Sequence, residues 1–403
     1  MLFLPILLSI PLAIVGHLAY GVIADLLTTK NEIVGDYLWY IFLTALSMAY
    51  FEVFYAWVKV QMQTVFGNFM KEVFHRVGAM LLLFLVYFKI INIDQFMMGI
   101  VGIYILRALI MMFHAFGRRL PVFRFDKIEK INSILKYSSL IIIAGSVSTI
   151  ILDLDKFMLN NYIEIEKVAY YSVAVFIATV IAVPQRSMHQ ILLPLTAQYL
   201  NEKNKIALKD LYQRSSLTLY VVSGFIFLLI VLNINELYEI IPSEFSGGLI
   251  VVFLISLAKL YDNLLGNNNA ILFNSDYYRM VLVFGVVLAV MAIILNMVLI
   301  PLYGINGSAI ATFIAIIVYN TIKIIFVKRK FNMLPFTSET LKITILLIVL
   351  VGGFYFWEFP FNPYVNIILK SLAIGVVYGF LIFKMNVSED ISEAIKKYTR
   401  FKA

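Results

Sequence analysis

The feature that most constrains this chain is a series of about a dozen apolar runs, each roughly 20 residues long and bounded by charged or turn residues. A helix of that length matches the hydrocarbon thickness of a lipid bilayer. The composition agrees, because 62% of the residues are hydrophobic, 14% are charged and the mean hydropathy is +0.91. An ordinary soluble domain is closer to a quarter charged. The sequence therefore predicts an all-α polytopic membrane protein.

The runs predict about 12 transmembrane helices. The run 168–198 is too long for one crossing and carries Pro184 and Pro194, so we expect a bent or broken helix there. The first run has no basic amino-terminal region and no small-residue cleavage site, so we expect a retained span rather than a signal peptide. The predicted spans are residues 2–24, 37–58, 74–91, 96–117, 137–157, 168–198, 215–233, 246–266, 279–300, 304–327, 341–358 and 364–384.

Lysine and arginine are concentrated in every second link between these spans. Basic residues mark the cytoplasmic ends of membrane helices, so this alternation places both termini in the cytoplasm. The same links account for the net charge of +8, and we expect no nucleic-acid partner. The basic segments are residues 59–73, 118–136, 199–214, 328–340 and 385–403.

The longest link, residues 118–136, suggests a division of the chain. It is basic with spaced apolar residues, a pattern typical of a helix that lies on the cytoplasmic leaflet. We expect an incomplete amino-terminal bundle of four helices over residues 1–117 and a carboxy-terminal bundle of eight over residues 137–384. Residues 385–403 read as an amphipathic cytoplasmic tail.

The sequence carries no recognisable catalytic or metal-binding motif. There is no cysteine, and the four histidines are widely spaced without an HExxH pattern. Neither a GxSxG motif nor a glycine-rich phosphate loop is present. We therefore expect a protein that is not an enzyme and that uses no metal or cofactor.

Polar residues inside apolar spans are the candidates for function, because ionisable groups in hydrocarbon are costly. Ser146, Thr149, Asp153 and Lys156 recur at intervals of three and four, so they share one helix face. An Asp153–Lys156 pair that closes the outer end of that helix explains the pattern equally well.

Two further spans carry internal cations. Arg107 lies near the middle of its span, where a snorkelling arginine is not expected, so we predict that it faces a cavity. Glu52 of another span is its alternative, purely structural partner. Arg186 and His189 are three residues apart, so they share a face just after Pro184.

The span 246–266 ends in a polar cluster. Lys259 and Asp262 are three residues apart, and an internal ion pair explains them as well as a ligand site does. Gly266 and the three asparagines 267–269 follow directly.

The stretch from Tyr137 to Leu195, which contains YSSLIIIAGSVS and VAVFIATVIAVPQRSMHQILLPL, resembles helices seven and eight of a known transporter group. That group is the polysaccharide and oligosaccharide-lipid flippases of the MATE-like multidrug/oligosaccharidyl-lipid/polysaccharide superfamily. The stretch from Leu257 to Ala311 is similar to helices ten to twelve of the same flippases. Residues 36–63, followed by residues 69–83, resemble helices four and five, which makes residues 2–24 helix three. The resemblance therefore implies that the family's first two helices are missing.

The resemblance implies a MATE-like fold of two bundles around a central cavity. It also implies a flippase that moves a polyprenyl-diphosphate-linked oligosaccharide across the bacterial inner membrane during O-antigen-like or capsule-like polysaccharide biosynthesis. Membrane lipids and the glycosyltransferases or polymerase of that assembly are the candidate partners. Candidate contacts are Arg107, Arg186 and Lys259 for the diphosphate, His189, Asp153 and Asp262 for the cavity wall, and Ser146, Asn267 and Asn269 for the sugars.

Three other functions are compatible with the sequence. An ion-coupled exporter of drugs or cations would use Asp153 as a protonation switch, but it should have a net acidic cavity. A membrane-embedded glycan polymerase or acyltransferase would need a catalytic cluster or a large outer loop. The third alternative is a scaffold that does not transport.

Overall fold

The computed structural model describes residues 37–59, 65–121 and 154–385, together with a few isolated positions. Within those residues the chain is helical, and no strand is found. Two compact units, Met1–Ile131 and Asn132–Ala403, divide the chain, and each is described by itself. Most of the predicted span 2–24 and of the link 118–136, and nearly all of the span 137–157 and of the tail 385–403, lie outside the described residues.

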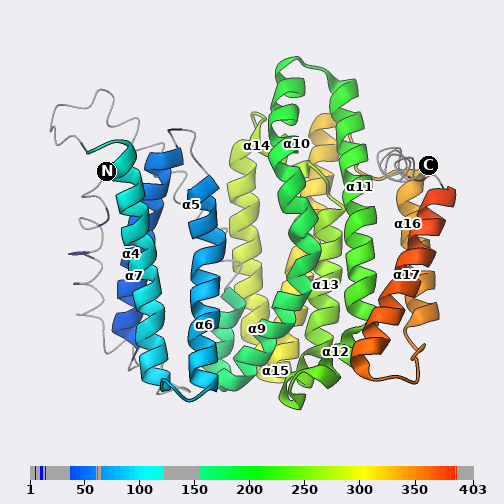
Figure 1. Ribbon diagram of the computed structural model, residues 1–403. Helices are drawn as coiled ribbons and strands as arrows, with labels where there is room; N and C mark the ends of the chain where they lie inside the picture. Colours follow the sequence, from blue (N-terminus) through cyan, green and yellow to red (C-terminus); the bar gives the residue numbers. More distant parts are fainter. Residues whose placement is uncertain are drawn as a thin grey trace, which may run out of the picture. The chain divides into compact units, whose positions relative to one another are not determined.

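The amino-terminal unit is built on two long helices that pack along each other (Figure 1). Its core is formed by Phe51, Phe54, Met111 and Ala115. A single π-helical turn joins two of its shorter helices, and Gly67 lies just before that turn, directly against the ring of Tyr55. The elements are α4 (Leu38–Lys59), α5 (Val65–Phe69), the π-turn η1 (Met70–Phe74), α6 (His75–Tyr87) and α7 (Ile93–Arg118).

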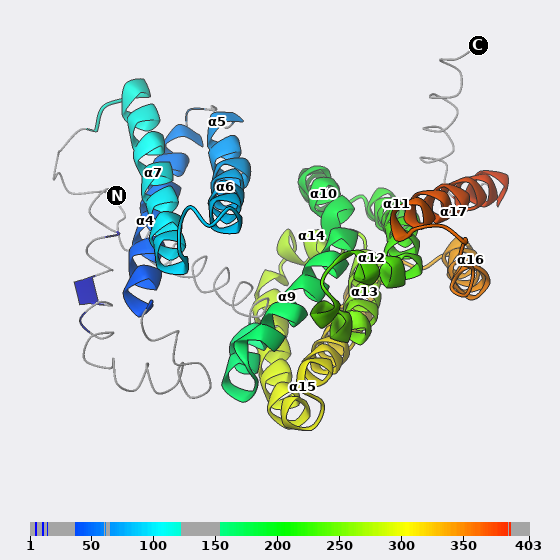
Figure 2. The same ribbon diagram turned by 60° about the horizontal axis from the view of Figure 1, so that its bottom comes forward.

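The carboxy-terminal unit surrounds one central helix, α11 (Lys205–Leu232). This helix contacts α10, α13, α16 and α17, and 67% of its most apolar 18-residue stretch is buried. Helices α16 and α17 lie beside it at one side of the unit (Figure 2). The other elements are α9 (Ile165–Thr179), η2 (Val180–Ala182), α10 (Val183–Asn201), α12 (Ile234–Ile240), η3 (Ser243–Gly248), α13 (Leu249–Asn263), α14 (Asn268–Phe273), α15 (Tyr278–Phe331), α16 (Ser338–Phe354) and α17 (Pro363–Met385).

The segment 168–198, which we expected to be a bent or broken helix, is interrupted. A 3₁₀ turn, η2, separates α9 from α10, and Pro184 falls in the first turn of α10. Proline is tolerated there because the main-chain N–H groups of the first helical turn have no intrahelical acceptor. Pro194 lies inside α10, which continues through it.

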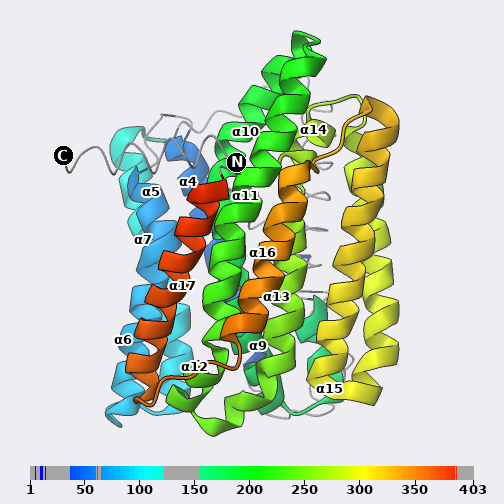
Figure 3. The same ribbon diagram turned by 90° about the vertical axis from the view of Figure 1, so that its right-hand side faces the viewer.

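Helix α15 is two membrane passes joined by a sharp turn. Gly304 has φ of 56° and ψ of −131°, which no helical residue adopts, and Pro301 lies just before it. The two halves then run side by side from this turn (Figure 3). Gly307 allows the close approach, because a Cβ at that position would overlap the main-chain carbonyl of Leu299.

Ten of the predicted spans fall within the described residues, and each coincides with helix. Seven of the described helices are long and apolar enough to cross a membrane, and α15 alone supplies two of the predicted spans. The all-α polytopic fold class is therefore confirmed.

Replacing Gly307 by alanine should destabilise the turn of α15, because the new methyl group overlaps backbone that cannot move aside. Overpacking of this kind costs about 1–3 kcal/mol. We expect a lower midpoint of thermal unfolding in detergent. Gly352→Ala is the matched control, since nothing lies within 4 Å of the Cβ it would add. Equal stability of the two variants would contradict this account of the turn.

Candidate functional site

The candidate site is centred on a break at the end of α13. The helix ends at Asn263, and a short turn leads into α14 at Asn268. Gly266 has φ of 56° in this turn, and a Cβ there would lie 2.6 Å from the main-chain nitrogen of Ser216. Only glycine satisfies both constraints, so the glycine before the asparagine run is what allows α13 to break against α11.

Side chains beside this break and beside the break between α9 and α10 donate hydrogen bonds to main-chain carbonyl oxygens at the other break. Asn263 Nδ2 donates to the carbonyl oxygen of Ile181, at 2.7 Å, and Gln185 Nε2 donates to the carbonyl oxygen of Asp262, at 3.5 Å. Ser216 Oγ donates to the carbonyl oxygen of Leu264, at 2.6 Å. Broken helices at membrane depth need such internal partners, because lipid offers none. The two breaks therefore form one polar centre.

Two of the three asparagines point into the protein. Asn267 Nδ2 donates to Thr196 Oγ1 of α10, at 2.8 Å, and Asn268 Nδ2 donates to the hydroxyl of Tyr212 of α11, at 2.6 Å. Both asparagines are buried. Among the described residues, neither Asn267 Oδ1 nor Asn268 Oδ1 has a hydrogen-bond partner.

The third asparagine binds a buried lysine that our sequence analysis did not single out. Lys323 of α15 is 1% exposed, and its Nζ donates to Asn269 Oδ1, at 3.0 Å. The same Nζ lies 4.3 Å from the ring centroid of Tyr319 and interacts electrostatically with Asp262. Asp262 Oδ1 itself accepts a hydrogen bond from Asn320 Nδ2, at 3.1 Å. Asp262, Asn269, Asn320 and Lys323 thus form one cluster.

The remaining candidates of this unit lie around the same break. Arg186 is exposed, and His189 and Lys259 are half-buried. No ion pair joins Lys259 to Asp262 in the described part of the chain, so the structural pairing that the sequence allowed is not formed. Ser146 and Asp153 lie outside the described residues.

Asp155 is a buried carboxylate that we did not single out as a candidate. It is 6% exposed, accepts a hydrogen bond from the hydroxyl of Tyr171 and accepts a second from the main-chain N–H of Lys156, at 2.9 Å.

In the amino-terminal unit, Arg107 is 4% exposed and stacks on aromatic rings. Its guanidinium carbon lies 3.9 Å from the ring centroid of Phe51 and 5.3 Å from that of Tyr104. Glu52, its alternative partner, instead forms an ion pair with Lys71 at 2.7 Å. Arg107 has no ion pair within the described ranges, and its Nε has no hydrogen-bond acceptor there.

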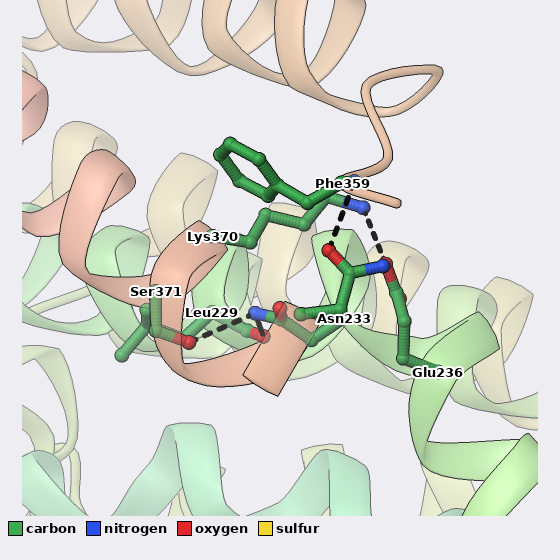
Figure 4. Close-up of polar contacts among 7 residues, drawn as sticks. Leu229, Asn233, Glu236, Phe359, Lys370 and Ser371 are labelled. Atoms are coloured by element: carbon green, nitrogen blue, oxygen red, sulfur yellow. Dashed lines mark hydrogen bonds and ion pairs between the residues drawn. The ribbon is translucent and has the colours of Figure 1, made fainter. Parts of the chain in front are cut away.

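A second buried lysine shows what a fully paired cation looks like in this protein. Lys370 of α17, 2% exposed, forms an ion pair with Glu236 of α12 at 2.9 Å. Asn233 donates to Ser371 at 3.2 Å beside it, and Figure 4 shows how these side chains fasten α17 to the end of α11 and to α12. This network explains the position of α17 without any ligand.

One sequence signal could have pointed to a missed residue, and the other missed pair had none. Asn320 and Lys323 are three apart on α15, but the basic residues 328–330 follow closely, so Lys323 reads as part of the cytoplasmic end. Lys370 and Glu236 are 134 residues apart, and nothing local links them.

The fold and its buried polar centre define an all-helical membrane protein with several spans. Among solved structures, the chain resembles the lipid II flippase MurJ in an inward closed conformation, with a TM-score of 0.74 and 14% sequence identity. The match covers 94% of this chain and 82% of that chain. No protein-family model and no curated protein matches the sequence. At this identity the likeness shows the fold.

Removing one partner of the buried Lys370–Glu236 pair should be strongly destabilising. Lys370→Met leaves Glu236 as an unpaired buried charge, which costs about 3–5 kcal/mol. Thermal unfolding of the purified protein should show the loss, and the double variant Lys370→Met, Glu236→Gln should regain most of it. Lys342→Met is the control, because it breaks an exposed pair with Glu339 that is worth about 0–1 kcal/mol. Equal losses of stability in the Lys370 and Lys342 variants would contradict the greater structural importance of the buried pair.

Proposed function

We propose that this protein is a flippase that moves a polyprenyl-diphosphate-linked oligosaccharide from the inner to the outer leaflet of the bacterial inner membrane. The pathway would be the synthesis of an envelope polysaccharide of the O-antigen or capsule type. The fold supports the proposal, since a solved structure with the same fold is described as a lipid II flippase.

The observation that carries the proposal is the environment of Arg107. An arginine buried among membrane helices is costly unless something compensates its charge. Within the described residues, Arg107 lies against two aromatic rings and forms no direct ion pair. Glu52 and Glu72 act on it only as nearby charges, because they are bound to Lys71 and Arg76. Its planar donor fork can chelate two oxygens of a diphosphate. The guanidinium is therefore positioned by the rings and keeps its charge available for an anion.

The polar groups of the carboxy-terminal unit suit the rest of the substrate. Arg186 and Lys259 are the further candidate contacts for phosphate, and both retain exposed surface. Asn267, Asn269 and Ser146 remain the proposed contacts for sugar hydroxyls, with His189, Asp153 and Asp262 as proposed cavity residues. Because Asn267 is 1% exposed, its contact would require the break between α13 and α14 to open. The proposed transport cycle is alternating access by rocking of one bundle against the other.

Substituting Arg107 should impair translocation without unfolding the protein. Arg107→Gln removes the charge, and loss of hydrogen bonds between charged groups weakens binding by about 1.5–3 kcal/mol, or roughly tenfold to a hundredfold. Translocation of a fluorescent lipid-linked oligosaccharide in proteoliposomes should fall accordingly. Arg107→Lys should recover only part of it, because lysine lacks the bidentate fork.

Arg329→Gln is the matched control, since Arg329 is an exposed arginine at the end of α15. Its translocation rate should equal that of the unmodified protein. If Arg107→Gln translocates normally, or if its midpoint of thermal unfolding falls sharply, Arg107 is a structural contact between α4 and α7.

The proposed orientation has its own test, and the absence of cysteine makes it simple. Lys330→Cys lies in a basic link and Glu358→Cys in an acidic one, and both positions are exposed. In intact cells, a membrane-impermeant thiol reagent should label Glu358→Cys and spare Lys330→Cys, which should react only after the cells are lysed. The opposite pattern would reverse the topology.

A further inference from the structure

Lys323 connects the two sides of the break in α13. Asp262 lies in the last turn of α13 and Asn269 in the first turn of α14, on opposite sides of Gly266. The ammonium group donates to Asn269 Oδ1, at 3.0 Å, and lies in the field of Asp262. One cation from α15 therefore binds the start of α14 directly and interacts with the end of α13 through the charge of Asp262.

The contacts of this ammonium differ from those of Lys370. Lys370 is bound directly to a carboxylate, at 2.9 Å, whereas Lys323 is bound to a neutral amide oxygen and faces the ring of Tyr319. The nearby carboxylate of Asp262 is instead fixed by Asn320. Lys323 thus has one neutral oxygen as its hydrogen-bond acceptor, and within the described residues it forms no direct ion pair.

The side chains of Asp262, Asn269 and Asn320 together have the composition of a site for a small monovalent cation. Carboxylate and amide oxygens are the ligands that hard cations prefer. One oxygen is unused: Asn320 is 0% exposed, and its Oδ1 has no hydrogen-bond partner among the described residues. The same side-chain amide orients Asp262 through its nitrogen, at 3.1 Å.

We propose that Asp262, Asn269 and Asn320 form a monovalent-cation site within the membrane, and that the protein fills this site with the ammonium of its own Lys323. The tethered cation neutralises Asp262 and fastens α14 to α15. The break is therefore held together without a dissolved ion. Removal of the lysine side chain creates a protein that needs a small cation from solution at the same place.

The test is the thermal unfolding of Lys323→Ala in detergent, in choline, sodium or ethylammonium chloride at equal ionic strength. In choline, which is too large for the site, the variant should unfold below the unmodified protein. Sodium or ethylammonium should raise its midpoint by about 2–4 °C or more, because a ligand that binds the folded state stabilises it. The unmodified protein should respond to neither salt.

Two further variants identify the site. Lys323→Met fills the space with an apolar chain and should not respond to cations. Adding Asp262→Asn to Lys323→Ala should abolish the response, because the site loses its negative charge. No response in Lys323→Ala, or a response that persists without Asp262, would overturn the proposal.

If Lys323→Ala does not fold, a double-mutant cycle of Lys323 and Asp262 tests the proposal. Lys323→Met and Asp262→Asn should each lower the yield and the unfolding midpoint, and the double variant should regain part of both, since neither charge is then left alone. Losses that simply add would contradict the proposal. None of these measurements depends on translocation, so the cation site and the flippase function can fail independently.

Discussion

The structure depends on one requirement of the bilayer: each main-chain N–H and C=O that a helix releases must find a partner inside the protein. The carboxy-terminal unit breaks two helices and meets this requirement by setting the breaks against each other. The side-chain amide of Asn263 donates a hydrogen bond to the carbonyl oxygen of Ile181, and that of Gln185 donates to the carbonyl oxygen of Asp262. Each interruption thus supplies side-chain donors to the other, which accounts for their placement together. The polar centre is a consequence of that placement.

The same bilayer makes each buried charge expensive, and the described residues show three ways of keeping a buried cation. Lys370 has a carboxylate in direct contact. Lys323 has a neutral oxygen, an aromatic ring and a carboxylate held by another residue. Arg107 has two ring faces and, within the described residues, no direct ion pair. The first arrangement is complete and structural. In the other two, no carboxylate is in direct contact with the cation. Arg107 is the proposed contact for the anionic substrate, and Lys323 occupies the proposed cation site.

The sequence predicted the helices well because each span is a local property: its length and apolarity decide where it lies. The break in 168–198 was also predictable, since prolines act locally.

The site was predictable only in part. Gly266 and the asparagine run stood out, and Asp262 was identified beside them. The partner of Asp262 was not, because Asn320 lies 58 residues away and nothing local connects them. The alternative structural pairings, Arg107 with Glu52 and Lys259 with Asp262, are not formed, since Glu52 and Asp262 have other partners, Lys71 and Asn320.

The π-turn Met70–Phe74 has a consequence for how this protein can change over evolution. Such a turn holds more residues than an α-helical turn does, so it behaves as a one-residue insertion. Deleting one residue would turn α5 by about 100° relative to α6, because each α-helical residue advances the helix by that angle. Gly67 would leave the ring of Tyr55, and a larger side chain would meet it instead. Point substitutions in this segment are therefore far easier to tolerate than a change in its length.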